Sequence, residues 1–431
     1  MAVVRFGAAK ELITPDFPTH MIGFAEAYGK NTFDYIHDDL YVRALIIDDG
    51  ASRHLVMCFD LLFHNRDLHE FITEIAKQHG VNPDGILVNY THTHYAPAVT
   101  GYFSELADKK YEEFLRQRAV NCLNKCMLNL QPGVIEYGKT RAGENISRRK
   151  PVDGKVELAP NPDAPVDDEM NIFRLYDIAG HTRCILFSYS CHPLTVGAQM
   201  QLTAEFPGRV CSLLEAQYYG CVPIFMQAVG GDAHPRLTAV NGAFVPGGFD
   251  DIDAMSKALT LRLNMTLSDP NAMRPVDLAL GARRFVMKLP LNVYEKTFFE
   301  LELNRENSNA LRGQAGIIVN NYDKLPDFCI VNGGVWQLAK GLNLVFLGGE
   351  ACYDTKRVLR TAFPKRELLV VSFCDSTAYV PSDGIISAGG YEAEGSVIEY
   401  VLKGSFALGV DAAIINAAGS AFEQIDKEQT A

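Results

Sequence analysis

Residues 86–97 read ILVNYTHTHYAP, a short apolar run that leads directly into two histidines. The preceding NPDG (82–85) is a turn signal, so the run is typical of a buried strand. Side chains at positions i and i+2 of a strand point to the same face, and His92 and His94 are therefore expected to share one pocket. Neutral imidazole is a common ligand of zinc and related metals. The stretch thus indicates a metal site at the end of a strand.

The same pattern, an apolar strand followed by a polar side chain, recurs along the chain. Runs at 42–49 and 54–62 predict one hairpin, and runs on either side of IAGH (178–181) predict a second. Helical spacing predicts helices over residues 66–79 (capped by Asn65), 106–130, 207–218 and 354–361, and the polar segment 303–327 is expected to be a loop or flap. Further polar residues that follow an apolar run are His192, Asp232, Glu350 and Asp375.

This alternation predicts the fold class. We expect an α/β fold, a large mixed-sheet body with helices packed on the sheets and ligands bound at strand ends. The chain has 431 residues, 48% of them apolar, which is ample for a large core. It contains no linker rich in Pro, Gly or Ser and no repeat of fixed period. We therefore expect residues 1–431 to form a single domain, an organisation that allows two lobes.

The composition of the chain indicates which partners and which cellular compartment to expect. The net charge of −12 argues against nucleic acid, and the chain has no apolar run of the ~18 residues that a membrane helix needs. The N-terminus does not resemble a secretory leader. Ten cysteines without a CxxC pair indicate free, mostly buried thiols. We expect a cytoplasmic protein without stable membrane insertion, and the sequence leaves its oligomeric state open.

The histidine pair needs further ligands, because a catalytic zinc site takes about three protein ligands and leaves one position open. A lone histidine at a strand end is more often a hydrogen-bonded core residue than a ligand. By position, His192 in SYSCHPLT and Glu350 in LGGEACYD are the best additional candidates. Asp60 could hold a ligand histidine from behind or could simply end its strand, and acidic neighbours could orient the ring of His37.

Several blocks, taken in order over roughly residues 4–400, resemble the neutral ceramidase family of zinc-dependent amidases. They are ITP followed by MIGF (13–24), IHDDLYVRALII (36–47), THTH with its nearby proline, CHPLT (191–195), GGE (348–350) and the late Tyr…Tyr-Glu pair. Each block alone is weak, but their common order is fairly specific. The family cleaves an N-acyl bond, so the resemblance implies the same reaction class.

Carried over residue by residue, the resemblance assigns roles to particular side chains. It implies that His92, His192, Glu350 and Tyr379 bind zinc, and that His94 faces the substrate or the developing oxyanion. Tyr391, twelve residues after Tyr379 as in the family, would contact the reacting carbonyl. The family's arginine corresponds to Arg148, in preference to its neighbour Arg149.

One block departs from the family. A serine to which a catalytic role is assigned in the family is replaced by His234 in GGDAHPR (230–236), so a serine nucleophile is impossible at this position. His234 could act as an acid/base group or contact the substrate, or could be a polar loop residue braced by Asp232. We also expect neither the signal peptide of the family's secreted members nor the C-terminal β-sandwich domain that many members carry.

The favoured hypothesis is a zinc-dependent hydrolase that cleaves an amide by metal-activated water. Its substrate would be a small N-acyl molecule, such as an N-acylated polar compound or sugar, in preference to ceramide, because the negative charge opposes anionic lipid surfaces. Alternatives are a metal-dependent lyase or isomerase, and a non-catalytic binding protein that retains the fold. A thiol hydrolase built on Cys191 is a weaker alternative.

Overall fold

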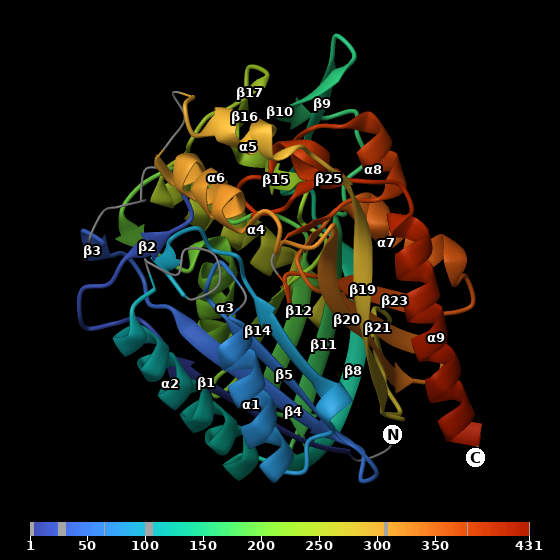
Figure 1. Ribbon diagram of the computed structural model, residues 1–431. Coiled ribbons are helices and arrows are strands. Elements are labelled where there is room, and N and C mark those ends of the chain that lie inside the picture. The colour runs from blue at the N-terminus through green and yellow to red at the C-terminus, as the bar shows by residue number, and fades with distance from the viewer. Residues whose placement is uncertain are drawn as a thin grey trace.

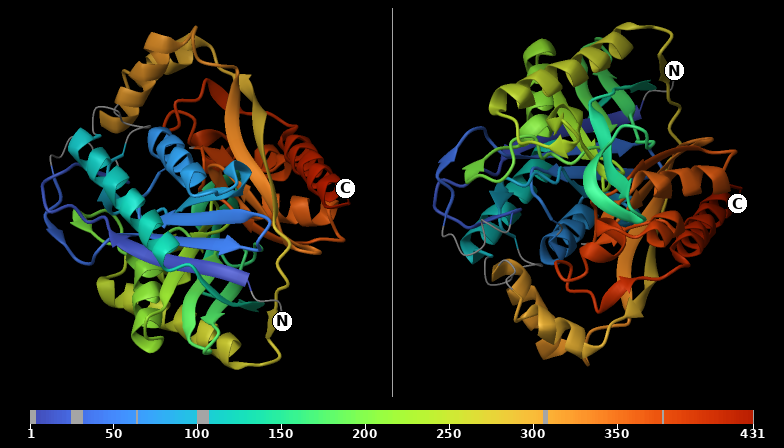
Figure 2. Two further views of the ribbon diagram at one scale, coloured as in Figure 1. Left: turned by 90° about the horizontal axis from the view of Figure 1, so that it is seen from below. Right: turned by 90° about the horizontal axis from the view of Figure 1, so that it is seen from above.

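Two β-sheets pack face to face, and helices cover the outer face of each (Figures 1 and 2). The structure, a computed structural model, describes residues 4–24, 32–63, 65–99, 107–305, 309–376 and 378–430. The resulting order of layers is helices, larger sheet, smaller sheet, helices. This architecture confirms the predicted α/β fold with a large mixed sheet and helices packed on it.

The larger sheet is nine-stranded and mixed. Its strands, in pairing order, are β14 (Val222–Gln227), β12 (Thr182–Tyr189), β11 (Glu169–Asp177), β8 (Gln131–Arg141), β1 (Val4–Leu12), β4 (Tyr41–Asp48), β5 (Arg53–Phe59) and β6 (Ile86–Tyr90), with β18 (Met273–Pro275) also paired to β8. Most neighbours are antiparallel, but β5 with β6 and β12 with β14 are parallel pairs. Both predicted hairpins, β4–β5 and β11–β12, are confirmed.

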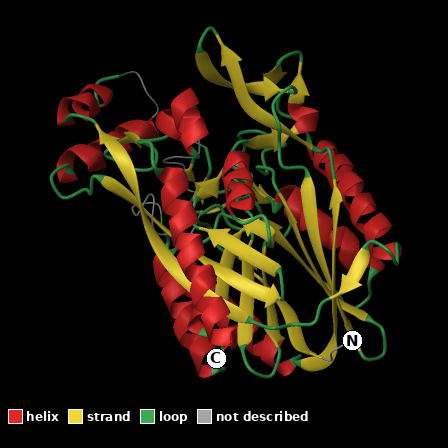
Figure 3. Ribbon diagram, turned by 90° about the vertical axis from the view of Figure 1, so that its right-hand side faces the viewer, coloured by secondary structure: helices red, strands yellow, loops and turns green. Residues whose placement is uncertain are grey.

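The smaller sheet has five strands. Figure 3 views the molecule from the side on which this sheet and its helices lie. In pairing order they are β23 (Glu367–Val371), β21 (Leu342–Leu347), β20 (Phe328–Ala339), β19 (Gly281–Val293) and β25 (Gly404–Phe406). Only β21 and β23 run parallel. Shorter strands pair locally, namely β10 (Lys155–Asn161), β9 (Asn145–Val152) and β15 (Ala233–Pro235); β13 (Gln201–Leu202) and β3 (Tyr35–Ile36); β16 (Ala239–Val240) and β17 (Ala243–Phe244); β2 (Met21–Ile22) and β7 (Ala96–Pro97); and β22 (Glu350–Ala351) and β24 (Tyr379–Val380).

The helices bury their apolar faces on the outer sides of the sheets. The larger sheet is covered by α1 (Arg66–Gln78), α2 (Lys109–Leu128), α3 (Glu205–Gln217) and α4 (Phe249–Ser268), and the smaller by α7 (Tyr353–Ala362) and α9 (Val410–Thr430). The remaining helices are α5 (Lys296–Glu302), α6 (Asn309–Asn321), α8 (Asp383–Ala388), and the short turns η2 (Pro83–Gly85), η3 (Arg236–Thr238) and η4 (Tyr391–Gly395). None of the helices in the described ranges is long and apolar enough to cross a membrane.

Local sequence signals account for several of these elements. As predicted, α1 begins after Asn65, whose side chain accepts a hydrogen bond from the Leu68 N–H. The expectation of a loop over residues 303–327 is wrong, because α6 occupies 309–321, while residues 306–308 lie outside the described ranges. Residue 106, at the expected start of α2, also lies outside them, and the helix begins at Lys109.

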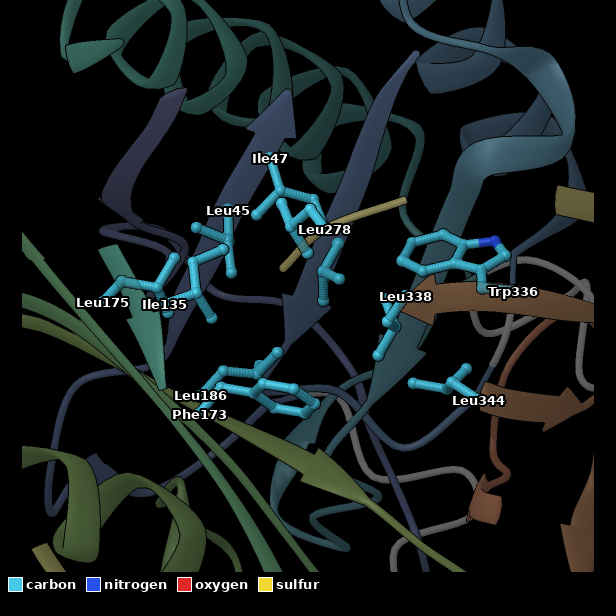
Figure 4. Close-up of a pocket in the computed structure, with 11 residues that line it drawn as sticks. Leu45, Ile47, Ile135, Phe173, Leu175, Leu186, Leu278, Trp336, Leu338 and Leu344 are labelled. Atoms are coloured by element: carbon cyan, nitrogen blue, oxygen red, sulfur yellow. The ribbon is translucent and has the colours of Figure 1, made fainter. Parts of the chain in front are cut away.

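The apolar core between the two sheets follows from strand alternation. In β4, Leu45 and Ile47 face the smaller sheet, whereas Ala44 and Ile46 face the helices. The core contains an apolar cavity of about 30 Å³, lined by residues of both sheets such as Leu45 and Trp336 (Figure 4). Val56 also lines it. A cavity of this size with an apolar lining offers no hydrogen-bond partner to water.

The larger sheet curls until its edge strands β6 and β14 approach each other, and the side chain of Asn89 joins them. Asn89 Oδ1 accepts from the Gln227 N–H at 2.9 Å, and its Nδ2 donates to the Ser372 carbonyl, just beyond β23, at 2.6 Å. The Tyr90 N–H donates to the Phe373 carbonyl at 3.0 Å. The carboxyl ends of strands from both sheets therefore meet at one point, where ligand-binding loops of α/β proteins usually gather.

Candidate metal centre

The THTH stretch lies at this meeting point, although not as a strand. Strand β6 ends at Tyr90, and His92 has a left-handed backbone with φ 65°. The prediction that strand alternation aligns the two histidines is therefore wrong. Their rings nevertheless meet, with 3.3 Å between the two Nε2 atoms, because the chain turns at His92 while its N–H donates to the Leu61 carbonyl. Histidine tolerates this conformation better than most residues.

His192 and Glu350 reach the same point from other strands. Glu350 Oε2 lies 3.1 Å from His192 Nε2 and 3.6 Å from His92 Nε2. Glu350 belongs to β22, which pairs in parallel with β24 so that Glu350 is the direct neighbour of Tyr379. The close approach of these strands requires Gly349, since a Cβ at that position would lie 2.2 Å from the Ala378 carbonyl oxygen. Gly349 thus allows Glu350 and Tyr379 to lie side by side.

The imidazole tautomers follow from the backbone. The Nδ1 atoms of His92, His94 and His192 lie 2.9, 2.8 and 2.7 Å from the carbonyl oxygens of Leu62, Gly23 and Gly230. Carbonyls only accept hydrogen bonds, so each Nδ1 carries the proton and each Nε2 presents a lone pair. Burial lowers the pKa of His92 to about 4 and that of His94 to about 3, which keeps both rings neutral at neutral pH.

This donor set fits a divalent metal. Three imidazole nitrogens lie within 4.8 Å of one another, and a carboxylate joins them. Burial alone would raise the pKa of Glu350, but its interactions with His92, His192 and the Tyr400 hydroxyl hold that pKa well below its usual range. Lone pairs that face each other at 3.3 Å repel unless a cation lies near them, so the approach of His94 Nε2 to His92 Nε2 favours a cation at this point. Neutral imidazoles beside an ionised carboxylate are the protonation states that metal binding requires.

Arg148 connects this group to the predicted tyrosines. Its Nη2 donates to the Tyr379 hydroxyl at 2.6 Å, and its Nε donates to Glu392 at 2.9 Å. The guanidinium lies 5.6 Å from the centre of the Tyr391 ring, and the Tyr391 hydroxyl donates to Glu399 at 2.5 Å. Burial raises the pKa of Tyr379 well above its usual value, so its phenol is neutral in this arrangement. Arg148, Tyr379 and Tyr391 therefore lie together beside the imidazoles.

His234 lies beside the group without belonging to it. Its Nδ1 is 3.0 Å from Thr238 Oγ1, its ring stacks on Phe244 at 4.1 Å, and burial lowers its pKa to about 3. Its loop nevertheless supports the site. The Ala233 carbonyl accepts the His192 N–H at 3.1 Å, and the Asp232 carbonyl accepts the Arg148 N–H at 3.0 Å. Asp232 thereby braces the loop through its backbone.

Three other sequence hypotheses have different outcomes. Asp60 does not orient a ligand histidine but forms a buried ion pair with Arg43 at 2.7 Å. The ring of His37 is 2.8 Å from Asp38, as its acidic neighbours suggested, but it stacks on Phe249 and does not join the imidazole group. Cys191 is buried, and burial raises the pKa of its thiol well above the usual value, which is unsuited to a nucleophile.

Sequence reasoning did not identify several residues of the site. Tyr400 donates a hydrogen bond to Glu350 Oε1, and Glu392 pairs with both Arg148 and Arg149. The ring of Phe373 lies 4.6 Å from that of His92. Glu392 could have been found from the Tyr-Glu dipeptide at 391–392, whereas Tyr400 and Phe373 have no local signal.

Comparison with solved structures identifies the fold. One match is the crystal structure of neutral ceramidase from Pseudomonas aeruginosa, with a TM-score of 0.74 and 17% identity over 98% of this chain and 75% of that chain. Another is a ceramidase complexed with C2, with a TM-score of 0.75 and 16% identity over 98% of this chain and 76% of that chain. No protein-family sequence model and no curated protein sequence matches the chain.

These likenesses define the class of structure to which the chain is similar. It has the neutral ceramidase fold along almost its whole length, and the resemblance read from the ordered sequence blocks is confirmed at that level. The low sequence identity makes it a divergent example of the fold.

Proposed function

We propose that this protein is a zinc-dependent hydrolase that cleaves an amide bond in a small N-acyl substrate. One observation carries the proposal: three buried or half-buried imidazole nitrogens and an ionised carboxylate converge beside a guanidinium and two phenols. The likeness to ceramidase structures suggests the same reaction class by analogy of fold, and the site itself is the physical support for that class.

In this proposal His92, His192 and Glu350 hold the metal, and Tyr379 supplies a further oxygen. His/His/Glu donors favour zinc over magnesium or calcium. A zinc ion bound there would lower the pKa of a water molecule towards 7 and polarise a carbonyl. His92, His192 and Glu350 are buried, whereas His94 is half-buried. This exposure supports a role of His94 toward the substrate.

The protonation states suggest how the remaining side chains act. His94 Nε2 presents a lone pair beside the metal ligands, so it would accept a proton from the attacking water and could donate one afterwards. Arg148, which is charged, would stabilise the oxyanion, and Tyr391 would join it when its hydroxyl turns away from Glu399. The C–N bond then breaks as the leaving nitrogen takes up a proton. His234 would contribute a substrate contact at the edge of the site.

Apolar side chains beside His94 support an acyl group in the substrate. The partly buried Phe24 ring lies 5.3 Å from the His94 ring and would contact the acyl group, and the buried side chains of Met21, Tyr95 and Met200 form the cluster on which it packs. The ten cysteines all lie in the described part of the chain, are buried and form no disulfide, which supports a reducing compartment such as the cytoplasm.

The test combines metal analysis with product analysis. Purified wild type is expected to contain one zinc per chain, and His92→Ala is expected to lose it. A panel of N-acyl amides with short to long acyl groups is then hydrolysed in H₂¹⁸O. Incorporation of ¹⁸O into the carboxylic acid supports hydrolysis, whereas turnover without ¹⁸O would indicate a lyase or isomerase. A wild type without bound metal would overturn the proposal, and bound zinc without turnover of any amide would favour a binding protein.

A further inference from the structure

Tyr400 contacts the candidate metal site from behind. Its hydroxyl donates to Glu350 Oε1, while Glu350 Oε2 faces His192 and His92 at 3.1 and 3.6 Å. The hydroxyl therefore occupies one carboxylate oxygen and leaves the other directed at the imidazoles. The Tyr400 ring also packs against that of Tyr379 at 5.4 Å, which fixes the direction of the hydroxyl.

The turn that carries Tyr400 is held by its own backbone. The Tyr400 N–H donates to the Ser396 carbonyl at 3.1 Å, the Leu402 N–H donates to the Val397 carbonyl at 2.9 Å, and Val401 has a left-handed φ of 50°. Tyr400 is buried, with 8% of its surface exposed. Its position is therefore set by the fold and does not depend on the bond to Glu350.

We infer that Tyr400 is a positioning residue for the metal-binding carboxylate, which it holds so that only one oxygen faces the metal. The inference rests on the proposed function, because it requires Glu350 to bind a metal. Groups that hold a metal ligand by hydrogen bonding typically contribute 10- to 100-fold to affinity. Without the hydroxyl, Glu350 Oε1 would be buried without this donor, and both oxygens could turn toward the metal.

The neighbouring residue provides a matched control. Glu399 lies in the same turn and also forms a hydrogen bond with a residue of the site, the Tyr391 hydroxyl, but not with Glu350. Glu399→Met removes that bond from the same turn. Tyr137→Phe is a second control, because Tyr137 is buried in β8 and loses a bond to Asn171 of 2.9 Å that lies in the core of the sheet.

The experiment measures zinc affinity of the full chain by competition with a chelator, together with X-ray absorption of the zinc-loaded protein. Tyr400→Phe is expected to weaken the Kd for zinc by ~10- to 100-fold and to add an oxygen neighbour to the zinc. Both controls are expected to stay within about threefold of wild type. Tyr400→His, which keeps a ring that can donate a hydrogen bond, should recover part of the affinity if Tyr400→Phe folds poorly.

Three outcomes would count against the positioning role of Tyr400 or against the proposed function. Equal zinc affinity and an unchanged zinc environment in Tyr400→Phe would overturn the inference while leaving the proposed function intact. An equal loss of affinity in Tyr400→Phe and in the two controls would also overturn it, because it would show general loosening. Absence of zinc binding in the wild type would instead sink the proposed function, and the inference with it.

Discussion

Replacement of His92 by alanine should impair metal binding, whereas replacement of His94 should impair the chemical step. The side chains are two residues apart, and their Nε2 atoms are 3.3 Å apart, so proximity alone does not separate their roles. Burial and partners do. His92 is 2% exposed and lies 3.6 Å from Glu350, whereas His94 is half-buried and contacts Phe24. We expect His92 to bind the metal and His94 to act on the substrate.

The magnitude can be worked from the number of ligands. Zinc sites in small domains bind with about 10–16 kcal/mol, which shared among the four proposed ligands is about 2.5–4 kcal/mol each. His92→Ala should therefore raise the Kd for zinc by roughly 10²- to 10³-fold. His94→Ala should change the Kd by less than about tenfold but lower kcat by ~10²- to 10⁴-fold, the usual contribution of a general base.

The assay is zinc content and chelator competition, followed by kcat and KM on an amide that the wild type hydrolyses. His181→Ala, at an exposed turn, serves as the control for loss of an imidazole. Loss of zinc from His94→Ala as complete as from His92→Ala would refute the division and make His94 a ligand. Full zinc content in His92→Ala would refute the ligand assignment itself.

Other predictions concern pH, packing and the thiol alternative. Burial lowers the pKa of His54 to about 4, so the unfolded chain takes up a proton at a higher pH than the folded protein does. The free energy of unfolding should therefore fall by roughly 3 kcal/mol as pH falls from 6.5 to 4. Urea unfolding of His54→Leu should not show this loss. Burial raises the pKa of Glu205 to about 7, so its contribution of roughly 3 kcal/mol should be lost as pH rises from 4.5 to 7, a dependence absent from Glu205→Gln. Val56→Ile should partly fill the apolar cavity and add about 0.8 kcal/mol to the free energy of unfolding; a decrease would show that the cavity cannot take a methylene. Cys191→Ala should retain wild-type activity, whereas a chelator should abolish the activity of the wild type. Loss of activity in Cys191→Ala together with activity that survives the chelator would support the thiol mechanism.

Local rules predicted the elements whose partners are near in sequence. The hairpin of β4 and β5 and the capped helix α1 each depend on periodicity and turn residues within about 20 positions. The segment 303–327 was expected to be a loop because it is polar, yet α6 forms within it, since a helix there needs only a narrow apolar stripe for its partly buried face.

The candidate site depends on contacts that no local rule contains. Arg148 and Glu392 are 244 positions apart, and Tyr400 and Glu350 are 50 apart. The choice of His192, Glu350 and Tyr379 came from the order of family-like blocks and from strand-end positions, and the structure brings these side chains to one point. Tyr400 belongs to no such block, and its role could not be predicted because it depends on a hydrogen bond to Glu350 that only the fold creates.

The failure of strand alternation at His92 shows why the site resists prediction from local pattern. His92 and Phe373 both have left-handed backbones, with φ 65° and 58°, and their rings lie 4.6 Å apart. Such conformations cost of order 1–3 kcal/mol each and persist where the surroundings fix them. Here the N–H of His92 binds the Leu61 carbonyl, and the carbonyl of Phe373 binds the Tyr90 N–H across the two sheets. The strain is therefore held by the junction of the sheets, and the same junction aims the ring of His92 at Glu350. Local preference and global structure disagree at the residue where the metal would bind, which is where such conflicts are expected in a functional protein.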